Sequence, residues 1–343
     1  MLGAPTFNAQ LAPVIVVCLG PVGERAYSTA AVRTSDMRVA MERAAEFLLS
    51  CQFPSGAIND RIANPLAALT VVRPSRRLSF RLKGGADIWH TTNAIAALSR
   101  IGRSNSAAEH FVRSKLTASG ELSYWSAYPS LCIETCSAAC HAMPREQARL
   151  RATIVRHALP GGRWATSMVP AAGGYDAYLA GPSVTAWALG ALGREPARLA
   201  RAGRSFLQNT LSEDGLWRAH PAFYATSFYP AHLAIRFVPT ATKAAVVAAT
   251  LRRQTASGGW GFIADGRPSS LPTAFALSTL VGSGVKTSRL VRAIGRAVRW
   301  LLENQKSAGG FRLSPAPAVV FYAGDVYATA VATMALAEAA EVL

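Results

Sequence analysis

The sequence predicts an all-α fold, a closed double ring of six inner and six outer helices, and three observations lead to this prediction. A helix-pair pattern recurs six times, with its anchor residues 44, 50, 45, 43 and 56 residues apart. A repeat of this length corresponds to one supersecondary unit per copy. One helix of each pair is amphipathic and the other is apolar on all sides, so the second must be enclosed. The anchors are Thr91, Thr135, Thr185, Pro230, Thr273 and Thr329.

The first helix of each pair has a broad charged face and one apolar stripe, which is typical of an outer helix. Most of these helices end at a short glycine-rich segment, such as Gly-Gly or Gly-x-aromatic. We expect the outer helices at residues 37–52, 106–116, 145–159, 197–210, 242–254 and 288–305.

The second helix of each pair is rich in alanine, nearly free of charge, and carries Thr or Pro in its first turn. Because these inner helices all start after a loop, their first turns should gather at one end of the ring. Unpaired N–H groups and positive dipole ends then converge on a central cavity, where we expect the active site. The inner helices are predicted at residues 87–98, 133–143, 183–192, 229–235, 272–280 and 325–336.

The repeats predict a single toroidal domain at residues 36–343, preceded by an N-terminal arm at residues 1–35. Half of the residues are apolar and only 16% are charged, which excludes a disordered chain. The apolar segment at residues 11–20 is too short to span a bilayer and has no basic region before it. We therefore expect this arm to pack on the domain.

The net charge of +17 comes mostly from arginines spread over the outer helices, a pattern typical of a solvated basic surface. The sequence contains no compact run of basic residues with aromatic residues between them, so no nucleic-acid partner is expected. Peripheral contact with anionic lipid stays open as an alternative. Five cysteines form an odd set that does not resemble a disulfide framework, which favours a reducing, cytoplasmic compartment. The oligomeric state is not predicted.

Two segments resemble the repeated Gln-x-x-x-Gly-x-Trp element of the terpenoid cyclases. They are residues 254–260 (QTASGGW) and 305–311 (QKSAGGF), the second with Phe in place of Trp. The chain thereby resembles the superfamily of terpenoid cyclases and protein prenyltransferase β subunits. The resemblance implies an (α/α)6 toroid and a hydrophobic isoprenoid substrate.

Protonation-initiated cyclases of this superfamily carry an Asp-x-Asp-Asp or Asp-x-Asp-Thr-Thr element whose middle aspartate is the proton donor. Placing Thr91 on the threonine of that element puts Asp87 on its first aspartate, but Trp89 and His90 on the second and third. The usual donor is therefore missing, and His90 is the neighbour expected to tune Asp87. Anchored on Thr91 and Thr135, His90 and Glu134 occupy the same repeat position. The catalytic candidates are Asp87, His90, Glu134 and Asp325, and capping of helices is the alternative role of Asp87 and Asp325.

Aromatic residues on or beside the inner helices are candidates for substrate binding. Their π faces would stabilise carbocations, although aromatic packing in a core is the alternative. The set is Trp89, Trp187, Phe228, Tyr229, Phe275, Tyr322 and Tyr327.

A zinc site is the alternative to an acid site that needs no cofactor. The segment Asp87-Ile-Trp-His90-Thr91 resembles the Asp-x-x-His-Thr ligand segment of zinc-dependent prenyltransferase β subunits. The resemblance implies His90, Cys132 and Glu134 as ligands, with Cys136 as an alternative. Against this, Cys132, Cys136 and Cys140 follow one helical stripe, and cysteine is among the most buried residue types.

Three functions follow from these patterns. The leading hypothesis is a terpene-cyclase-like enzyme of the isomerase or lyase class that cyclises or isomerises a linear isoprenoid through acid-initiated carbocation chemistry. The second is zinc-dependent prenyltransferase-like or cyclase chemistry. The third is a toroid without catalytic activity that binds a lipid or a protein.

Overall fold

The computed structural model describes residues 32–60, 68–73, 76–81, 87–126, 128–165, 181–218, 227–262, 266–313 and 324–343. The chain divides into two units, Met1–Ala30 and Ala31–Leu343, and nearly all of the predicted N-terminal arm lies outside the described residues. The unit Ala31–Leu343 holds the predicted repeats. Among the described residues, no helix is both long and apolar enough to cross a membrane.

Twelve α-helices alternate between the two predicted types within the described residues. The outer helices begin and end close to the predicted boundaries. They are α1 (Thr34–Ser50), α3 (Ser106–Ser114), α5 (Gln147–Arg156), α7 (Ala197–Asn209), α9 (Thr240–Arg252) and α11 (Ser288–Glu303). The inner helices are α2 (Asp87–Arg100), α4 (Ile133–Ala142), α6 (Pro182–Leu192), α8 (Phe228–Ala234), α10 (Ser270–Gly282) and α12 (Asp325–Ala340). Two short 3₁₀ helices, Pro144–Glu146 and Ile235–Phe237, accompany α5 and α8.

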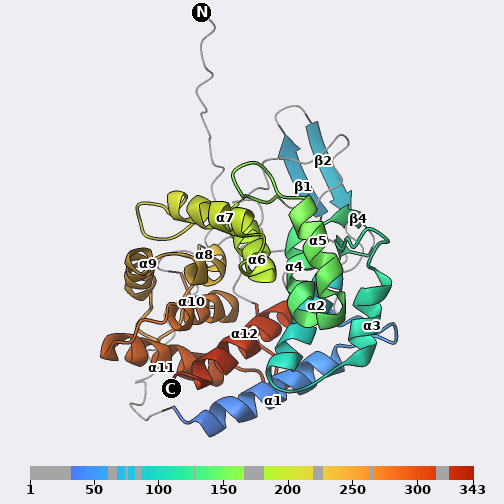
Figure 1. The fold of residues 1–343 in the computed structure, drawn as a ribbon. Coiled ribbons are helices and arrows are strands. Elements are labelled where there is room, and N and C mark those ends of the chain that lie inside the picture. The colour runs from blue at the N-terminus through green and yellow to red at the C-terminus, as the bar shows by residue number, and fades with distance from the viewer. Residues whose placement is uncertain are drawn as a thin grey trace, which may run out of the picture. The chain divides into compact units, whose positions relative to one another are not determined.

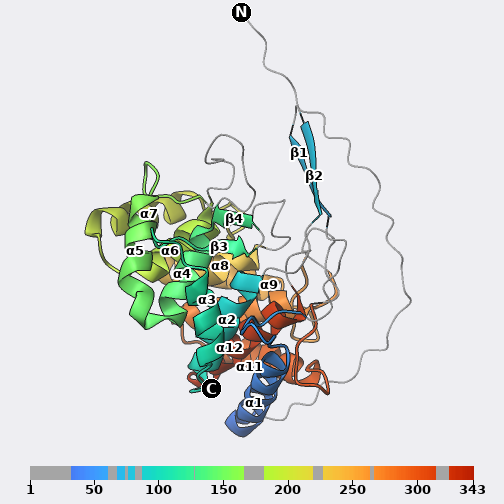
Figure 2. The same cartoon turned by 90° about the vertical axis from the view of Figure 1, so that its right-hand side faces the viewer.

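The inner helices form a closed ring. Each of them packs against the next, from α2 through α4, α6, α8 and α10 to α12, and α12 packs against α2 (Figures 1 and 2). Outer helices cover this ring, with α1 lying against both α11 and α12. The predicted double ring, the (α/α)6 toroid, is therefore confirmed.

Two β-hairpins were not predicted from the sequence. One pairs β1 (Ala68–Arg73) with β2 (Arg76–Arg81), antiparallel, and lies between α1 and α2 in the chain. The other pairs β3 (Ser123–Trp125) with β4 (Tyr128–Leu131) between α3 and α4. Both are insertions within connections, where the helical repeat gives no signal, although the Leu-Thr-Val-Val run of β1 has the β-branched composition of a strand.

The glutamines of the two quoted repeat elements join each repeat to the next. Gln254 Nε2 donates to Gly258 O at 2.8 Å and to Ala293 O of α11 at 2.9 Å. Gln305 Nε2 makes the same pair of bonds, to Gly309 O at 2.7 Å and to Ala40 O of α1 at 2.8 Å. The sixth repeat is thereby fastened to the first.

A close backbone approach explains the glycine of this element. Gly309 has φ +89°, and a Cβ placed there would lie 2.1 Å from the carbonyl oxygen of Arg43 on α1. Gly258 has φ +97°, and its Cβ would lie 2.7 Å from the carbonyl oxygen of Arg296 on α11. Only glycine fits where the loop meets the next outer helix this closely.

The tryptophans of the repeat loops are structural. Trp164, Trp217 and Trp260 are fully buried, and each indole Nε1 donates to a carbonyl of the preceding outer helix. The acceptor is always ten residues earlier, at Ile154, Leu207 and Thr250. These bonds hold each loop on its own outer helix and at the entrance to the inner helix.

Candidate active site

A threonine in the first turn of four inner helices fixes the position of each helix in the ring. The hydroxyl oxygens of Thr91, Thr185, Thr273 and Thr329 accept hydrogen bonds from backbone N–H groups of the preceding repeat loop. The four donors are Ile58, Trp164, Trp260 and Phe311. These bonds define equivalent positions in the repeats independently of the sequence alignment.

The second repeat departs from the alignment by one residue. The N–H of Leu122 donates to Cys136 Sγ at 3.4 Å, so Cys136 and not Thr135 stands at the anchor position. Glu134 then corresponds to Trp89 and Tyr327, two residues before their anchors, rather than to His90. The prediction that Glu134 and His90 are equivalent is wrong for this reason.

Glu134 is the fully buried carboxylic acid at this inward-facing position. The Tyr229 hydroxyl of α8 donates to its Oε1 at 2.9 Å, and Trp187 Nε1 of α6 donates to the same hydroxyl at 2.9 Å. Since α4 and α8 are not neighbours in the ring, this chain of bonds crosses the interior of the toroid. Helix α4 begins one residue before Glu134, so the carboxyl also lies near a positive dipole end.

Aromatic rings surround this interior. The Trp89 ring lies 5.5 Å from Tyr124, 5.7 Å from Trp187 and 5.5 Å from Tyr327, measured between centroids. Phe275 of α10 completes the set, 5.3 Å from Tyr229 and 6.5 Å from Tyr327. Helices α2 and α6 are also not neighbours, so these side chains meet across the ring. Tyr124, on β3, was missed because its hairpin was not predicted.

The Tyr327 phenol is neutral. Burial raises its pKa well above the usual value, and the nearby Glu134 carboxylate raises it further. Glu134 lies on α4 and Tyr327 on α12, so this electrostatic effect indicates that the two side chains approach each other inside the ring. Neutral tyrosines present polarisable faces and no opposing charge to a bound ligand.

His232 of α8 stacks on Phe275, with ring centroids 4.5 Å apart at 21°, and lies 5.6 Å from the Tyr229 ring. Burial lowers the pKa of His232 to about 3, so the imidazole is neutral at physiological pH. The residue nevertheless keeps some accessible surface, as does Trp187.

His90 is oriented by residues other than the predicted Asp87. Its Nδ1 lies 2.6 Å from Asn59 Oδ1 and 3.7 Å from Asp60 Oδ2. Asp60 Oδ1 in turn accepts from the N–H of Val326, in the first turn of α12. The His90 ring lies nearly parallel to Tyr327, 6.2 Å away. Asn59 and Asp60 were missed, although they end the first copy of the repeated loop.

Asp87 and Asp325 bind loops. Asp87 Oδ1 accepts from the N–H of Ser126 at 2.8 Å, in the hairpin of the next repeat. Asp325 Oδ1 accepts from the N–H of Leu313 at 2.9 Å, and its Oδ2 is ion-paired with Lys306. Both carboxylates thus have positioning partners, and the predicted cap of α12 is supplied by Asp60 instead.

The predicted zinc ligands do not come together. The described residues contain no group of three or more His, Cys, Asp or Glu side chains placed to hold a metal ion. Cys132 caps α4 by accepting from the N–H of Thr135 at 3.4 Å, and Cys136 is occupied at the anchor position. Burial also raises the pKa of Cys136, which opposes the thiolate form that zinc requires. This donor set does not fit a zinc ion.

One predicted substrate contact, Phe228, packs toward a neighbouring repeat loop. Phe228 lies against Trp260, with ring centroids 6.3 Å apart, at the loop of the next repeat. Tyr322 lies outside the described residues. The central group that the structure brings together is Trp89, Glu134, Trp187, Tyr229, His232, Phe275 and Tyr327.

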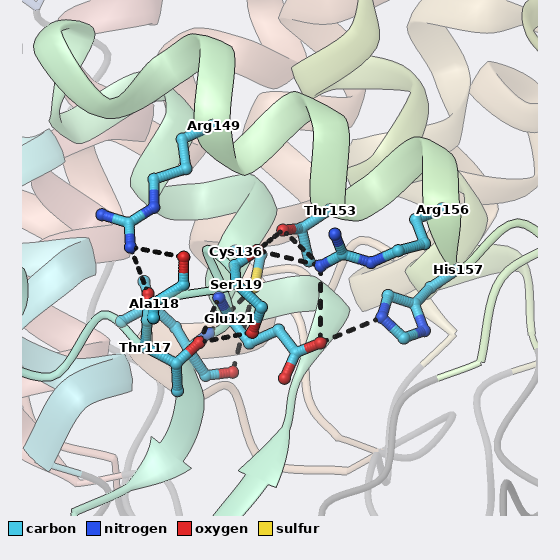
Figure 3. A network of polar contacts seen from close by, with 10 residues as sticks. Thr117, Ala118, Ser119, Glu121, Cys136, Arg149, Thr153, Arg156 and His157 are labelled. Atoms are coloured by element: carbon cyan, nitrogen blue, oxygen red, sulfur yellow. Dashed lines mark hydrogen bonds and ion pairs between the residues drawn. The ribbon is translucent and has the colours of Figure 1, made fainter.

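A polar network outside the ring supports the hairpin that carries Tyr124 (Figure 3). From α5, Thr153 Oγ1 donates to Ser119 O at 3.0 Å, and Arg149 donates to Ala118 O at 2.8 Å. Glu121 Oε1 lies 3.2 Å from Nε2 of His157, the residue after α5. The loop before β3 is therefore fixed from the outside, while Tyr124 faces the inside.

No protein-family description matches the chain, and no curated protein matches its sequence. Solved structures do match its fold. The type II terpene cyclase MstE from Scytonema superposes with a TM-score of 0.67 at 16% identity, covering 90% of this chain and 100% of that one. The same cyclase is also matched in complex with its substrate geranylgeranyl dihydroxybenzoate, with a TM-score of 0.66 at 17% identity.

More distant matches share the toroid. The ent-copalyl diphosphate synthase from Streptomyces platensis has a TM-score of 0.56 at 16% identity, covering 89% of this chain and 67% of that one. A structure from Klebsiella pneumoniae described as a possible member of the GH105 family has a TM-score of 0.57 at 14% identity, covering 94% and 96%. The chain therefore has a terpenoid-cyclase-like toroid fold, and its chemistry has to be argued from its own residues.

Proposed function

We propose that this protein is a terpene-cyclase-like enzyme that binds a linear isoprenoid in the toroid and cyclises it after protonation by Glu134. One observation carries the proposal: a fully buried carboxyl group, held by Tyr229, lies among aromatic rings at the amino-terminal ends of the inner helices. Its position two residues before the anchor is the one from which Trp89 and Tyr327 also point inward.

The chemistry follows from the environment of Glu134. In the proposed reaction Glu134 acts as a general acid, which donates the proton of its carboxyl group to the substrate. The Tyr229 hydroxyl, which donates to Oε1, positions this carboxyl group in the interior. The π electrons of a substrate C=C bond take this proton as a new C–H bond, which leaves a carbocation and a Glu134 carboxylate.

Ring closure then needs no reagent other than water. A second C=C bond attacks the cation, and a water molecule takes a proton from carbon at the end, which gives a cyclic isomer of the substrate while Glu134 regains a proton from solvent. The faces of Trp89, Tyr327 and Phe275 stabilise the positive charge meanwhile, each by about 0.5 to 2 kcal/mol. A neutral imidazole at His232 adds no opposing cation.

The substrate class rests on the hydrophobic lining and on the fold matches. MstE is bound to geranylgeranyl dihydroxybenzoate in one matched structure and to merosterolic acid A in another. The first panel to test is therefore this compound together with linear prenyl diphosphates of ten to twenty carbons. The aromatic interior suits any of these chains.

Incubation of the purified protein with this panel in D₂O tests the proposal. The expected product is heavier than the substrate by the mass difference between a deuteron and a proton, because one solvent-derived deuteron enters and one proton leaves. Glu134→Gln should lower turnover by a factor of about 10³ or more, while the control Glu109→Gln on the outer helix α3 should leave it unchanged. Full activity of Glu134→Gln would overturn the assignment, and tight binding of a prenyl compound without conversion would identify a lipid-binding protein instead.

A further inference from the structure

We propose that one outer face of the toroid, formed by α7, α9 and α11, docks on an anionic lipid surface. The face is rich in exposed basic side chains and nearly free of acidic ones. Helices α7 and α9 contain no Asp or Glu, and α11 contains only Glu303, its last residue. We call this the basic face, defined by the exposed side chains of Arg198, Arg201, Arg204, Arg289, Arg292 and Arg296.

The basic face is continuous. The loop after α7 packs on α9, since a Cβ at Gly215 would lie 2.9 Å from Ala249 Cβ. The loop after α9 packs on α11 in the same way, through Gly258 and Arg296. Figure 1 shows α7, α9 and α11 following one another along one side of the ring. The arginines of α7 and α11 therefore border the same surface.

The loop after α7 carries Glu213 and Asp214, and Asp214 pairs with Arg253 and Arg218, but the arginines that define the basic face do not pair with either acid. Arg198, Arg201 and Arg204 on α7, and Arg289 and Arg292 on α11, form no ion pair within the described residues. The opposite situation holds on α1, where Glu42 and Glu46 both bind Arg103. Arg103 beside α1 thus has acidic partners that the arginines of the basic face lack.

The residues between the arginine rows favour lipid headgroups as the anionic partner. Helix α9 presents the small side chains of Ala241, Ala244, Ala245 and Ala248, which allow close approach to a broad surface. The one large apolar side chain that is exposed on the described part of these helices is Val291, so no aromatic platform for nucleic-acid bases is present. Guanidinium groups bind phosphate oxygens with paired hydrogen bonds, which suits phospholipid headgroups.

Sedimentation with lipid vesicles tests this proposal with the full chain. Vesicles of pure phosphatidylcholine should not bind, whereas vesicles in which about one third of the lipid is phosphatidylglycerol should. Each arginine near such a surface contributes on the order of 1 kcal/mol, so Arg198→Gln with Arg201→Gln should weaken binding about 30-fold. The matched control, Lys115→Gln with Arg145→Gln, removes the same charge from exposed positions elsewhere and should stay within a few-fold of the original chain.

Salt and competitor experiments complete the test. Bound protein should be released at about 0.5 M salt, because the screening length then falls well below the reach of the arginine side chains. Equal losses in the α7 variant and the control would overturn the docking face in favour of overall charge. Equal binding to both kinds of vesicle, or complete displacement by duplex DNA at phosphate concentrations below those of the lipid, would also overturn it.

Discussion

The hydroxyl of Tyr229 on α8 donates a hydrogen bond to Glu134 Oε1 on α4, although these helices are separated by α6 in the inner ring. Trp187 of the intervening α6 donates to the same hydroxyl, so three successive inner helices share one buried polar chain. Buried polar groups of this kind are costly when a single member is removed. The group therefore links the stability of the toroid to the geometry of its candidate acid.

Replacing Tyr229 by Phe removes the central member of this chain. Glu134 Oε1 loses a donor and Trp187 Nε1 loses its acceptor, which should lower the free energy of unfolding by about 1 to 3 kcal/mol. If the proposed function is right, turnover should also fall about 10- to 100-fold with little change in KM. Chemical denaturation and steady-state kinetics measure the two effects, and an unchanged unfolding free energy would contradict the first.

Asp325 is expected to be structural. Its carboxylate holds Leu313 N–H and Lys306, so Asp325→Asn should weaken the loop and cost about 1 to 2 kcal/mol of stability. Turnover at a temperature where the variant remains folded should be retained, in contrast to Glu134→Gln. Loss of turnover in a folded Asp325→Asn variant would return this residue to the list of proton donors.

The depressed pKa of His232 gives a pH dependence with a defined sign. The unfolded chain binds a proton at His232 below about pH 6.5, while the native state does so only near pH 3. The contribution of His232 to the free energy of unfolding therefore has its full value above pH 6.5. It decreases as the pH falls toward 3, by up to about 1.4 kcal/mol per pH unit.

Comparison of variants isolates this contribution. Unfolding measured between pH 6.5 and 5 should show a shallower slope for His232→Gln than for the original chain. The matched variant His110→Gln, at an exposed position of α3, should keep the original slope. Parallel slopes in all three proteins would show that His232 is not desolvated in solution.

The contact at Gly309 that closes the ring of helices can be tested directly. Gly309→Ala places a Cβ 2.1 Å from Arg43 O at φ +89° and should destabilise the protein by about 3 kcal/mol or more. Gly102→Ala is the matched control, because Gly102 has φ +75° but nothing within 4 Å of its Cβ, and it should cost about 1 kcal/mol. Thermal unfolding of both variants gives the difference, and similar losses would argue against the close approach.

The cysteines of α4 should be chemically inert in the native protein. Burial raises the pKa of Cys136 and raises that of Cys140 to about 12, so neither forms a thiolate at pH 8. Iodoacetamide should leave both unmodified in native protein and should label all five cysteines in denaturant, as peptide mass spectrometry would show. Rapid labelling of native Cys136 would contradict the anchor role assigned to it.

The helical repeat made the toroid predictable, because periodicity and enclosure of the inner helices are properties of the sequence itself. The β1–β2 and β3–β4 hairpins were not predictable in that way, since they are inserted into connections that the repeat does not constrain. Glu134, Trp89, Tyr229 and Tyr327 were recognised as candidates because acidic and aromatic residues are conspicuous on helices that are otherwise rich in alanine.

The details of the site depended on tertiary contacts that the pattern does not contain. Thr135 and Cys136 are adjacent, and only the hydrogen bond from Leu122 shows that the cysteine is the anchor. Asn59 and Asp60 act on His90 and α12, and they meet those partners only because the first and sixth repeats adjoin. Asp87 was paired with His90 by proximity in sequence, whereas its side chain points to Ser126.

The bond from Gln305 to Ala40 also determines how the molecule should come apart. In an open array of repeats the terminal units lack one neighbour and fray first. Here the sixth repeat meets the first as each repeat meets its successor, so the array has no end unit from which unfolding can start. Hydrogen exchange of the six inner helices should consequently proceed through one cooperative opening, with comparable protection in α2 and α12 as in α6.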